Sequence, residues 1–493
     1  MFTKNICHLC RSAVSATAIL LFLFAATPGL RAADAAPPSN PRLQKGYRFQ
    51  KGGWTYVHLE GSPANIGFQH GYLLAPEIVD AYDAIKLFDT HQTRRDWAFF
   101  RKTAREMLWP QIDPEYQQEL QGIADGVKAH RGAKGDETGG ELDVYDIVAL
   151  NAFEEVPDYY VPWLNKQLKS ETAPKLAAPG NCSAFIATGA YTKDHKIVMA
   201  HNNWTSYLAG ERWVVIFDIA PTKGNRILMD GFPGVITSDD DFAVNSSGLM
   251  ITETTITQFE GWDPKGKPEF VRSRKALQYA NSIDDYASIM KEGNNGGYAN
   301  DWLIGDRKSG EIAYLELGLK NTPMWRTKDG YFVSSNFPRD EKLIREETSG
   351  FDVKDTSSSM NARHIRWEEL MQESKGKIDV ALAEQFLGDH MDSFEKKEQP
   401  NERGLCGHAD TSPRGVKEWD WSPYNPGGAV QGKAADSDMA GKMSFVARAG
   451  HPCGADFVAA DFLERHAEFA WQKPLLRDMK AGPWTTFKAG QKP

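Results

Sequence analysis

The strongest constraint in this sequence is a stretch at residues 171–181 that has no hydrophobic periodicity. It reads Glu-Thr-Ala-Pro-Lys-Leu-Ala-Ala-Pro-Gly-Asn, a composition typical of an exposed linker. Before it, apolar residues recur every three to four positions, which predicts helices at 75–87, 97–107, 114–130 and 144–153, after a strand at 54–60. We therefore expect a mainly helical part at 36–170, the linker at 171–181 and a different second part at 182–493.

The second part is rich in predicted strands. Residues 183–191 and 196–201 are β-prone runs, and a hairpin turn at 192–195 joins them. Further strands are predicted at 213–219, 226–229, 242–244, 249–255, 302–305, 312–317 and 331–334, and helices at 272–281, 283–291, 362–373 and 380–387. This mixture indicates an α+β fold whose strand-rich part begins at Cys182.

The first 35 residues have the pattern of an export signal. Lys4 and Arg11 supply positive charge, residues 13–24 are apolar, and Ala33-Asp-Ala35 is a plausible cleavage site. A retained anchor is disfavoured because the apolar run is short and ends at Pro28-Gly29. We expect a periplasmic or secreted protein without an integral membrane span. The net charge of -9 and the lack of any Lys/Arg run disfavour a nucleic-acid partner.

Cysteine usage leaves one thiol of special interest. Cys7 and Cys10 lie in the leader, so their Cys-x-x-Cys spacing predicts neither a redox nor a zinc site in the mature protein. Cys406 and Cys453 lie in the same region and can form a disulfide in an oxidising compartment. Cys182 then remains as a thiol, either as a small buried hydrophobe or as a nucleophile.

A cysteine at a newly made N-terminus carries two reactive groups. Its thiol is the nucleophile, and its α-amine, with an ordinary pKa of about 8, can act as the base. Within an intact chain that amine is part of a peptide bond, so such an enzyme must first cut its own backbone. Gly180 before Asn181 and Cys182 permits the unusual backbone geometry that self-attack needs. The hypothesis is cleavage between Asn181 and Cys182.

Several motifs follow one another along the second part of the chain. They are Cys182-Ser-Ala-Phe-Ile, Val198-Met-Ala-His-Asn-Asn-Trp204 with Tyr207, Phe232-Pro-Gly-Val-Ile-Thr-Ser-Asp-Asp240, Ser247-Gly-Leu-Met-Ile-Thr-Glu-Thr-Thr-Ile256, Tyr298-Ala-Asn-Asp-Trp302 and Ser335-Asn-Phe-Pro338. In their order and spacing they resemble the phospholipase B-like (laminal ancestor) family of N-terminal-nucleophile hydrolases. The helical part is similar to the related penicillin-acyltransferase-like group. The segments there are Gly61-Ser-Pro-Ala-Asn-Ile-Gly67, Gln69-His70-Gly71, Gly122-Ile-Ala-Asp-Gly126 and Leu150-Asn151-Ala152.

The resemblance implies a four-layer αββα sandwich with two antiparallel sheets, in which Cys182 is the nucleophile at the start of a strand. It places Asn336 as the side-chain donor to the oxyanion, and Thr254 and Thr255 at the substrate, where relatives have a second polar donor that here would be a hydroxyl. Turn formation and ordinary strand propensity are the competing explanations for these three residues.

The same resemblance assigns roles to residues at the end of the strand that is predicted at 196–201. It implies that His201 and Asn202 help to orient or deprotonate the catalytic groups, and that Asn203 and Trp204 contact the substrate. Arg363 matches a late orienting arginine, although Arg366 lies one helical turn further on. The run Asp239-Asp-Asp241 is expected to be a structural acidic turn rather than a metal site. Neither a metal nor another cofactor is expected.

The implied activity is removal of fatty acyl chains from phospholipids, with the two self-cleaved fragments remaining associated. An amidase or acyltransferase acting on N-acyl compounds would use the same thiol chemistry. A non-catalytic exported binding protein is the third possibility. The motifs of serine α/β-hydrolases, zinc peptidases and P-loop proteins are absent from the sequence.

Overall fold

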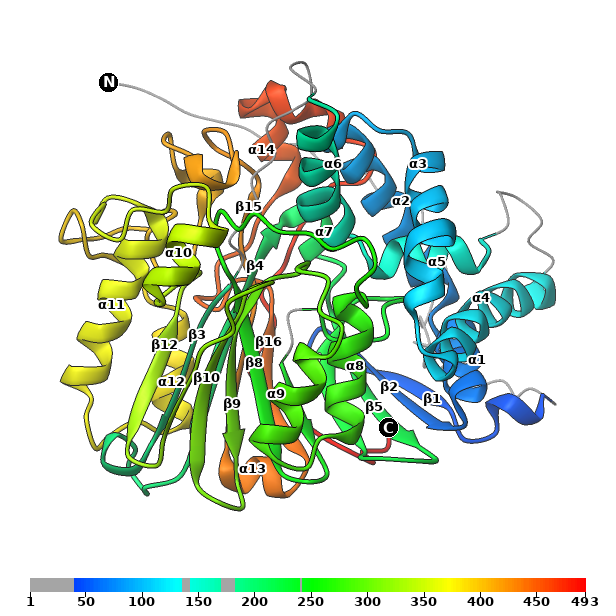
Figure 1. Cartoon of the computed structure of the whole chain (residues 1–493), viewed down its shortest axis with the longest axis horizontal. Helices are drawn as coiled ribbons and strands as arrows, with labels where there is room; N and C mark the ends of the chain where they lie inside the picture. Colours follow the sequence, from blue (N-terminus) through cyan, green and yellow to red (C-terminus); the bar gives the residue numbers. More distant parts are fainter. Residues whose placement is uncertain (1–39, 135–141, 170–181, 240–241) are drawn as a thin grey trace, which may run out of the picture. The chain divides into compact units, whose positions relative to one another are not determined.

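Two β-sheets lie face to face between two groups of helices (Figure 1). A computed structural model of the protein describes residues 40–134, 142–169, 182–239 and 242–493. Residues 40–493 form one unit. The proposed leader (1–35), the linker (171–181) and Asn181 lie outside the described residues, so the expected part boundaries and the cleavage site remain predictions.

The larger sheet has nine strands and receives strands from both parts of the chain. Its order is β1 (Tyr47–Lys51), β2 (Trp54–Gly61), β5 (Val215–Pro221), β6 (Ile227–Gly231), β7 (Ala243–Asn245), β8 (Leu249–Thr255), β9 (Asn300–Asp306), β10 (Glu311–Leu317) and β11 (Met324–Thr327). All neighbours are antiparallel except β2 and β5. The expectation of a purely antiparallel sheet is wrong at this pair. The connection between them runs through the helical part and two strands of the other sheet, and parallel pairs need such a long connection.

The smaller sheet has six strands and contains the predicted nucleophile strand. Its order is β12 (Gly330–Ser334), β3 (Ser183–Thr188), β4 (Val198–Ser206), β15 (Gly427–Asp436), β16 (Ser444–Ala449) and β17 (Thr485–Lys488). All its pairs are antiparallel. The last three strands were not predicted, since β15 reads Gly-Gly-Ala-Val-Gln-Gly-Lys-Ala-Ala-Asp, and glycine and alanine are depleted in strands. A separate short ladder joins β13 (Met391–Asp392) to β14 (Lys397–Glu398).

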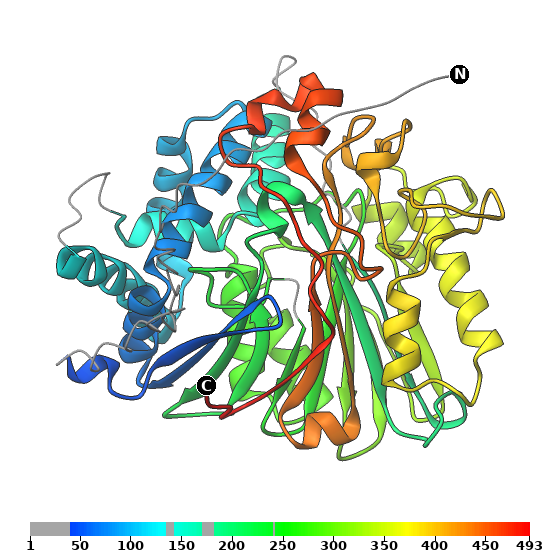
Figure 2. The same ribbon diagram turned by 180° about the vertical axis from the view of Figure 1, so that it is seen from behind.

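Strand alternation produces the four layers. In β3 and β4, Ile186 and Met199 pack between the sheets, whereas Phe185 and Ala200 pack against helices on the outer face. That outer face is covered by α11 (Ser359–Glu373) and α12 (Val380–Leu387). Figures 1 and 2 show these helices on one side of the sheets and the N-terminal helices on the other. The expected αββα order is confirmed.

A large core packs helices against the outer face of the nine-stranded sheet. Its main helices are α1 (Pro63–Leu73), α2 (Ala75–Thr93), α3 (Trp97–Thr103), α4 (Pro114–Lys134), α5 (Val144–Asn151), α6 (Val161–Gln167), α8 (Glu269–Tyr279) and α9 (Ile283–Lys291). The other helices are α7 (Tyr207–Gly210), α10 (Glu341–Glu347), α13 (Ser437–Gly441) and α14 (Ala459–Arg465). Within the described ranges, no helix combines the length and the apolar character needed to cross a bilayer.

The glycines of two sequence motifs lie where α1 crosses α4. A Cβ atom on Gly126 would stand 2.3 Å from the carbonyl oxygen of Phe68, and one on Gly71 would stand 2.0 Å from that of Ile123. Both obstacles are backbone atoms, which cannot rotate away as a side chain can. The spacing of glycines in the two motifs therefore permits the close approach of these helices.

Gly126→Ala is expected to destabilise the fold, because overpacking of a tight contact costs ~1–3 kcal/mol. Gly132→Ala is the matched control, since Gly132 lies in the same helix and a Cβ there meets nothing within 4 Å. That control should keep or raise stability, by up to about 1 kcal/mol. Denaturant titration of the two variants measures the difference. Equal stabilities would contradict this account of the helix crossing.

Candidate active site

Cys182 directly precedes β3 and is completely buried. Its φ angle of 89° lies in a region that non-glycine residues rarely adopt. The next residue, Ser183, accepts a hydrogen bond from Trp367 Nε1 at 2.7 Å, which ties the strand start to α11. The Cys182 thiol itself faces β4, where its Sγ lies 4.0 Å from Asn203 Oδ1. The backbone is thus held in a rare conformation at the residue that the sequence singled out.

A thiol, an imidazole and a carboxylate meet at this point. Cys182 Sγ, a ring nitrogen of His201 and a carboxylate oxygen of Glu253 all lie within 4.8 Å of one another. His201 belongs to β4 and Glu253 to β8, so the site joins the two sheets. All three side chains are buried. A nucleophile beside a base, with a third group that can orient the base, is the arrangement used in nucleophilic catalysis.

The surroundings of His201 keep its imidazole neutral. Burial lowers its pKa well below the usual 6.5, and the positive charge of Lys433 lowers it further. Lys433 pairs with His201 in the register of β15 and β4, and its Nζ lies 2.9 Å from Asp230 Oδ2. Ser238, from one of the family-like segments, donates to Asp230 Oδ1 at 2.8 Å. The imidazole is therefore in the form that can accept a proton, and the same two effects make it a weaker base than an exposed histidine.

Arg363 of α11 connects the nucleophile to the predicted oxyanion residue. Its Nη1 donates to the carbonyl oxygen of Cys182 at 2.7 Å, and its Nη2 donates to Asn336 Oδ1 at 2.8 Å. The guanidinium carbon lies 4.3 Å from the centre of the Trp204 ring. Burial lowers its pKa to about 9, so it remains a cation at neutral pH. Arg366 instead bonds Asp389, so of the two arginines it is Arg363 that contacts Cys182 and Asn336.

Asn336 follows β12 with a φ of 66°, a conformation that asparagine tolerates better than most residues. Its Nδ2 donates to the carbonyl oxygen of Thr255 at 2.9 Å, and its backbone N–H donates to Thr254 Oγ1 at 3.3 Å. Thr254 Oγ1 also lies 2.5 Å from Ser334 Oγ, whereas Thr255 Oγ1 donates to Tyr298. The structure therefore places the Thr254 hydroxyl, and not that of Thr255, against Asn336.

Strand register separates the residues predicted on β4. Ser183 pairs with Asn202 and Ala184 pairs with His201, so Asn202 faces the opposite side of the sheet from His201 and Asn203. The Asn202 amide donates to the carbonyl oxygens of Leu387 and Leu405 at 2.8 and 3.0 Å. The structure therefore places the Asn202 side chain away from the Cys182 thiol. Its two hydrogen bonds to backbone carbonyl groups give Asn202 a structural role as the alternative to the predicted catalytic one.

Trp204 was predicted to line the substrate pocket. It is completely buried beneath Arg363, and its Nε1 donates to the carbonyl oxygen of Leu405 at 3.2 Å. Contact with substrate remains a prediction for Trp204 and for Asn203. Asp239, in the predicted acidic turn, is buried, whereas Asp240 and Asp241 lie outside the described residues.

Glu253 and Lys433 were not singled out from the sequence. A signal was present for each: Glu253 is a carboxylate inside the apolar and threonine-rich run of β8, and Lys433 interrupts a run of small residues in β15. Both strands are buried along almost their whole length. A charged residue in a buried strand needs a partner, which makes it a candidate for function.

Two groups in the described part of the chain have the side chains needed to hold a metal ion. One is the Cys182, His201 and Glu253 group described above. The other consists of His390, Cys406, His408 and Cys453. The predicted disulfide between Cys406 and Cys453 does not occur in the structure, where both are thiols. Each of these sulfurs instead lies 3.6 Å from His408 Nε2.

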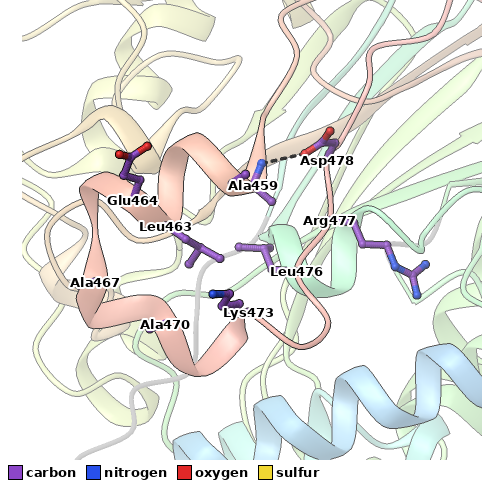
Figure 3. A pocket seen from close by; sticks show the side chains of 10 residues that line it. Ala459, Leu463, Glu464, Ala467, Ala470, Lys473, Leu476, Arg477 and Asp478 are labelled. Atoms are coloured by element: carbon purple, nitrogen blue, oxygen red, sulfur yellow. Dashed lines mark hydrogen bonds between the residues drawn. The ribbon is translucent and has the colours of Figure 1, made fainter.

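A surface pocket of about 530 Å³ lies along α14 and the segment that follows it (Figure 3). Its lining residues are Ala459, Ala460, Leu463, Glu464, Ala467, Ala470, Lys473, Leu476, Arg477 and Asp478. Ala459 donates a backbone hydrogen bond to Asp478 across one end. None of the residues around Cys182 belongs to this lining, and the chemistry of the thiol is therefore not assigned to this pocket.

Comparison with known proteins connects the site to a family. A family model described as "Phospholipase B" matches residues 68–314, a range that includes Cys182, His201 and Glu253. Putative phospholipase B-like 2 from Mus musculus is 33% identical over 164 residues, which are 30% of this chain and 27% of that protein. Phospholipase B-like 1 from Bos taurus is 24% identical over 434 residues, or 78% of this chain and 75% of that protein. The alignment with the Mus musculus protein, which has the higher identity of the two, thus covers about a quarter of that protein.

Proposed function

The chain belongs to the phospholipase B family, and on this premise we propose that it is a hydrolase in which the Cys182 thiol accepts an acyl group. The observation that carries the proposal is the meeting of Cys182, His201 and Glu253 within 4.8 Å, from two sheets, in the family-matched region. The hydrogen bonds from Arg363 to Cys182 and Asn336 support it.

We propose that the chain activates itself by cleavage between Asn181 and Cys182. Neutral His201 accepts the thiol proton, and the thiolate attacks the carbonyl carbon of residue 181. The C–N bond breaks, the amine of Cys182 takes the proton, and a thioester forms. Water then hydrolyses the thioester, which releases the thiol. The rare backbone conformation at Cys182 supports this step, since such conformations cost about 1–3 kcal/mol and cluster at functional sites.

The cleaved enzyme would use the thiol together with the new α-amine. The thiol attacks the carbonyl carbon of an acyl ester, its proton moves to the amine, and negative charge develops on the former carbonyl oxygen. The Asn336 amide nitrogen has two N–H groups, one of which bonds Thr255. In this proposal the Asn336 side-chain amide donates to the oxyanion, while Arg363 fixes the amide through its oxygen. The alcohol leaves, and water releases the fatty acid.

The proposed substrate is a phospholipid ester, because the similar proteins are named phospholipase B-like. An N-acyl compound would form the same thioester, and amide hydrolysis is the second candidate. Hydrolysis of a phospholipid and of an N-acyl amino acid with the same acyl chain, compared as kcat/KM, separates the two. We also propose that the leader directs export of the protein. Sequencing the N-terminus of the secreted protein tests this step.

Mapping the fragments of the purified protein tests the activation step. Two fragments are expected to co-elute under native conditions and separate in denaturant, and Edman sequencing of the larger should begin at Cys182. The α-amine is otherwise part of a peptide bond, so activity should rise with the cleaved fraction. A fully active preparation that remains one chain would refute the proposal.

A further inference from the structure

A second cluster of reactive side chains lies outside the Cys182 site and consists of His390, Cys406, His408 and Cys453. One ligand atom from each residue lies within 4.8 Å of the other three. Cys406 and His408 are buried, and His390 and Cys453 are partly buried. Two thiols and two imidazoles in one place are the ligand types that zinc prefers.

The distances from His408 Nε2 to the other three ligand atoms are close to those of a tetrahedral site. The Nε2 atoms of His390 and His408 lie 3.2 Å apart, and the sulfurs of Cys406 and Cys453 each lie 3.6 Å from His408 Nε2. Tetrahedral zinc, with Zn–N of about 2.0 Å and Zn–S of about 2.3 Å, separates two nitrogens by about 3.3 Å and a nitrogen from a sulfur by about 3.5 Å. The three partners of His408 therefore already lie at the spacing from its Nε2 atom that one shared ion requires.

We propose that His390, Cys406, His408 and Cys453 bind one Zn²⁺ ion in a structural site. Four protein ligands complete a tetrahedral coordination sphere, which leaves no position for water or substrate. Thiolate and imidazole ligands favour zinc over calcium and magnesium, which prefer oxygen. This proposal differs from the expectation drawn from the sequence, which was that the protein binds no metal. It is independent of the proposed hydrolase activity.

Backbone hydrogen bonds hold the ligands in place. The N–H of Cys406 donates to the carbonyl oxygen of Asp389 at 3.0 Å, and the N–H of His408 donates to that of Asn401 at 3.0 Å. Asp410 places a carboxylate oxygen 3.9 Å from His408 Nδ1. At this distance the two groups form no hydrogen bond, and the same oxygen accepts one from Tyr207 at 2.7 Å, so Asp410 contributes only its negative charge beside the ring.

The ion would join three segments that are far apart in the sequence and hold them against the six-stranded sheet that contains β3. His390 precedes β13, Cys406 and His408 follow β14, and Cys453 follows β16. The carbonyl oxygen of Leu405, next to Cys406, accepts the hydrogen bonds from Trp204 and Asn202 on β4. Zinc would therefore fix the segment at Leu405. Trp204 is bonded to this segment, and the Arg363 guanidinium packs on the Trp204 ring.

The competing explanation is a disulfide between Cys406 and Cys453, which an oxidising compartment favours. A disulfide needs a sulfur–sulfur distance of about 2.05 Å, and it gives no reason for two histidines to converge on the same point. A metal ion accounts for all four side chains.

Metal content of the untagged full-length protein tests the proposal. After dialysis, elemental analysis should give about one zinc per chain, consistent with a closed four-ligand site. Removal by a strong chelator should lower the melting temperature, and zinc should restore it. Cobalt substitution should give the intense ligand-field bands of a tetrahedral site with thiolate charge transfer. Absence of bound zinc and cobalt, or a Cys406–Cys453 disulfide in a non-reduced peptide map, would overturn the site.

Substitutions identify the ligands without depending on activity. His390→Gln and Cys453→Ser should each lose zinc, whereas His390→Cys should keep it, because three thiolates and one imidazole also form a zinc site. His195→Gln is the control, since His195 is exposed on the turn before β4. It should leave the zinc content unchanged. Full zinc content in a folded His390→Gln, Cys453→Ser double variant would exclude these residues as ligands.

Discussion

Cys182→Ala is expected to leave the chain uncut and to reduce acyl hydrolysis by at least about 10³-fold, since removal of a catalytic nucleophile takes away nearly all of the catalysis. The same atom is required twice, first for attack on the carbonyl of residue 181 and then for attack on substrate. Loss of the thiol should therefore abolish both processes together, whatever the substrate proves to be.

The fold should tolerate this substitution. Cys182 is completely buried, and alanine is a slightly smaller residue that leaves the strand backbone unchanged. Thermal unfolding of Cys182→Ala should remain cooperative, with a melting temperature within a few degrees of that of the natural protein. Cys182→Ser keeps a weaker nucleophile and should cleave more slowly than the natural protein. Lys193→Ala, at an exposed position on the neighbouring turn, is the control and should retain cleavage and turnover.

Gel electrophoresis, mass spectrometry and phospholipid hydrolysis measure the outcome. Normal turnover by Cys182→Ala would remove the thiol from the mechanism. Cleavage at residue 182 in the alanine variant would show that another nucleophile performs it. Loss of turnover with normal cleavage would confine Cys182 to the second reaction.

Arg363→Lys is expected to lower kcat by about 10²-fold, the effect of removing one oxyanion contact in other hydrolases. The guanidinium bonds the carbonyl oxygen of Cys182 and Oδ1 of Asn336 at the same time. A lysine ammonium is a single point donor on a flexible chain and cannot hold both in this geometry. The Asn336 amide would lose its fixed orientation, so Arg363 acts as a positioning residue.

Arg366→Lys provides the matched control, because Arg366 lies on the same helix and bonds Asp389. Its kcat should stay within about twofold, as expected for a partly exposed ion pair of small energetic value. The positioning role predicts a fall in kcat with little change in KM and a cooperative melting curve. A lower melting temperature with normal kcat in the cleaved Arg363→Lys protein would assign Arg363 to the fold alone.

Local patterns in the sequence predicted most of the helices and strands and singled out Cys182. Periodicity predicted α2, α4, α8, α9 and most strands of the larger sheet, since side-chain spacing of 3.6 and 2 residues reflects local backbone geometry. The linker ending before Cys182 predicted that a strand begins there, and β3 starts at Ser183. The sequence also showed the glycine motifs of α1 and α4, but it did not predict that these two helices cross.

Tertiary structure decided which distant residues meet. Pairing of β3 with β4 turned Asn203 toward the thiol and Asn202 away from it, because a shift of one residue reverses the face of a strand. Packing of the two sheets brought Glu253 to Cys182, and helix packing selected Arg363 over Arg366. The cluster from His390 to Cys453 has the same origin. Contacts between residues far apart in the chain leave no local periodicity, so only the folded arrangement revealed them.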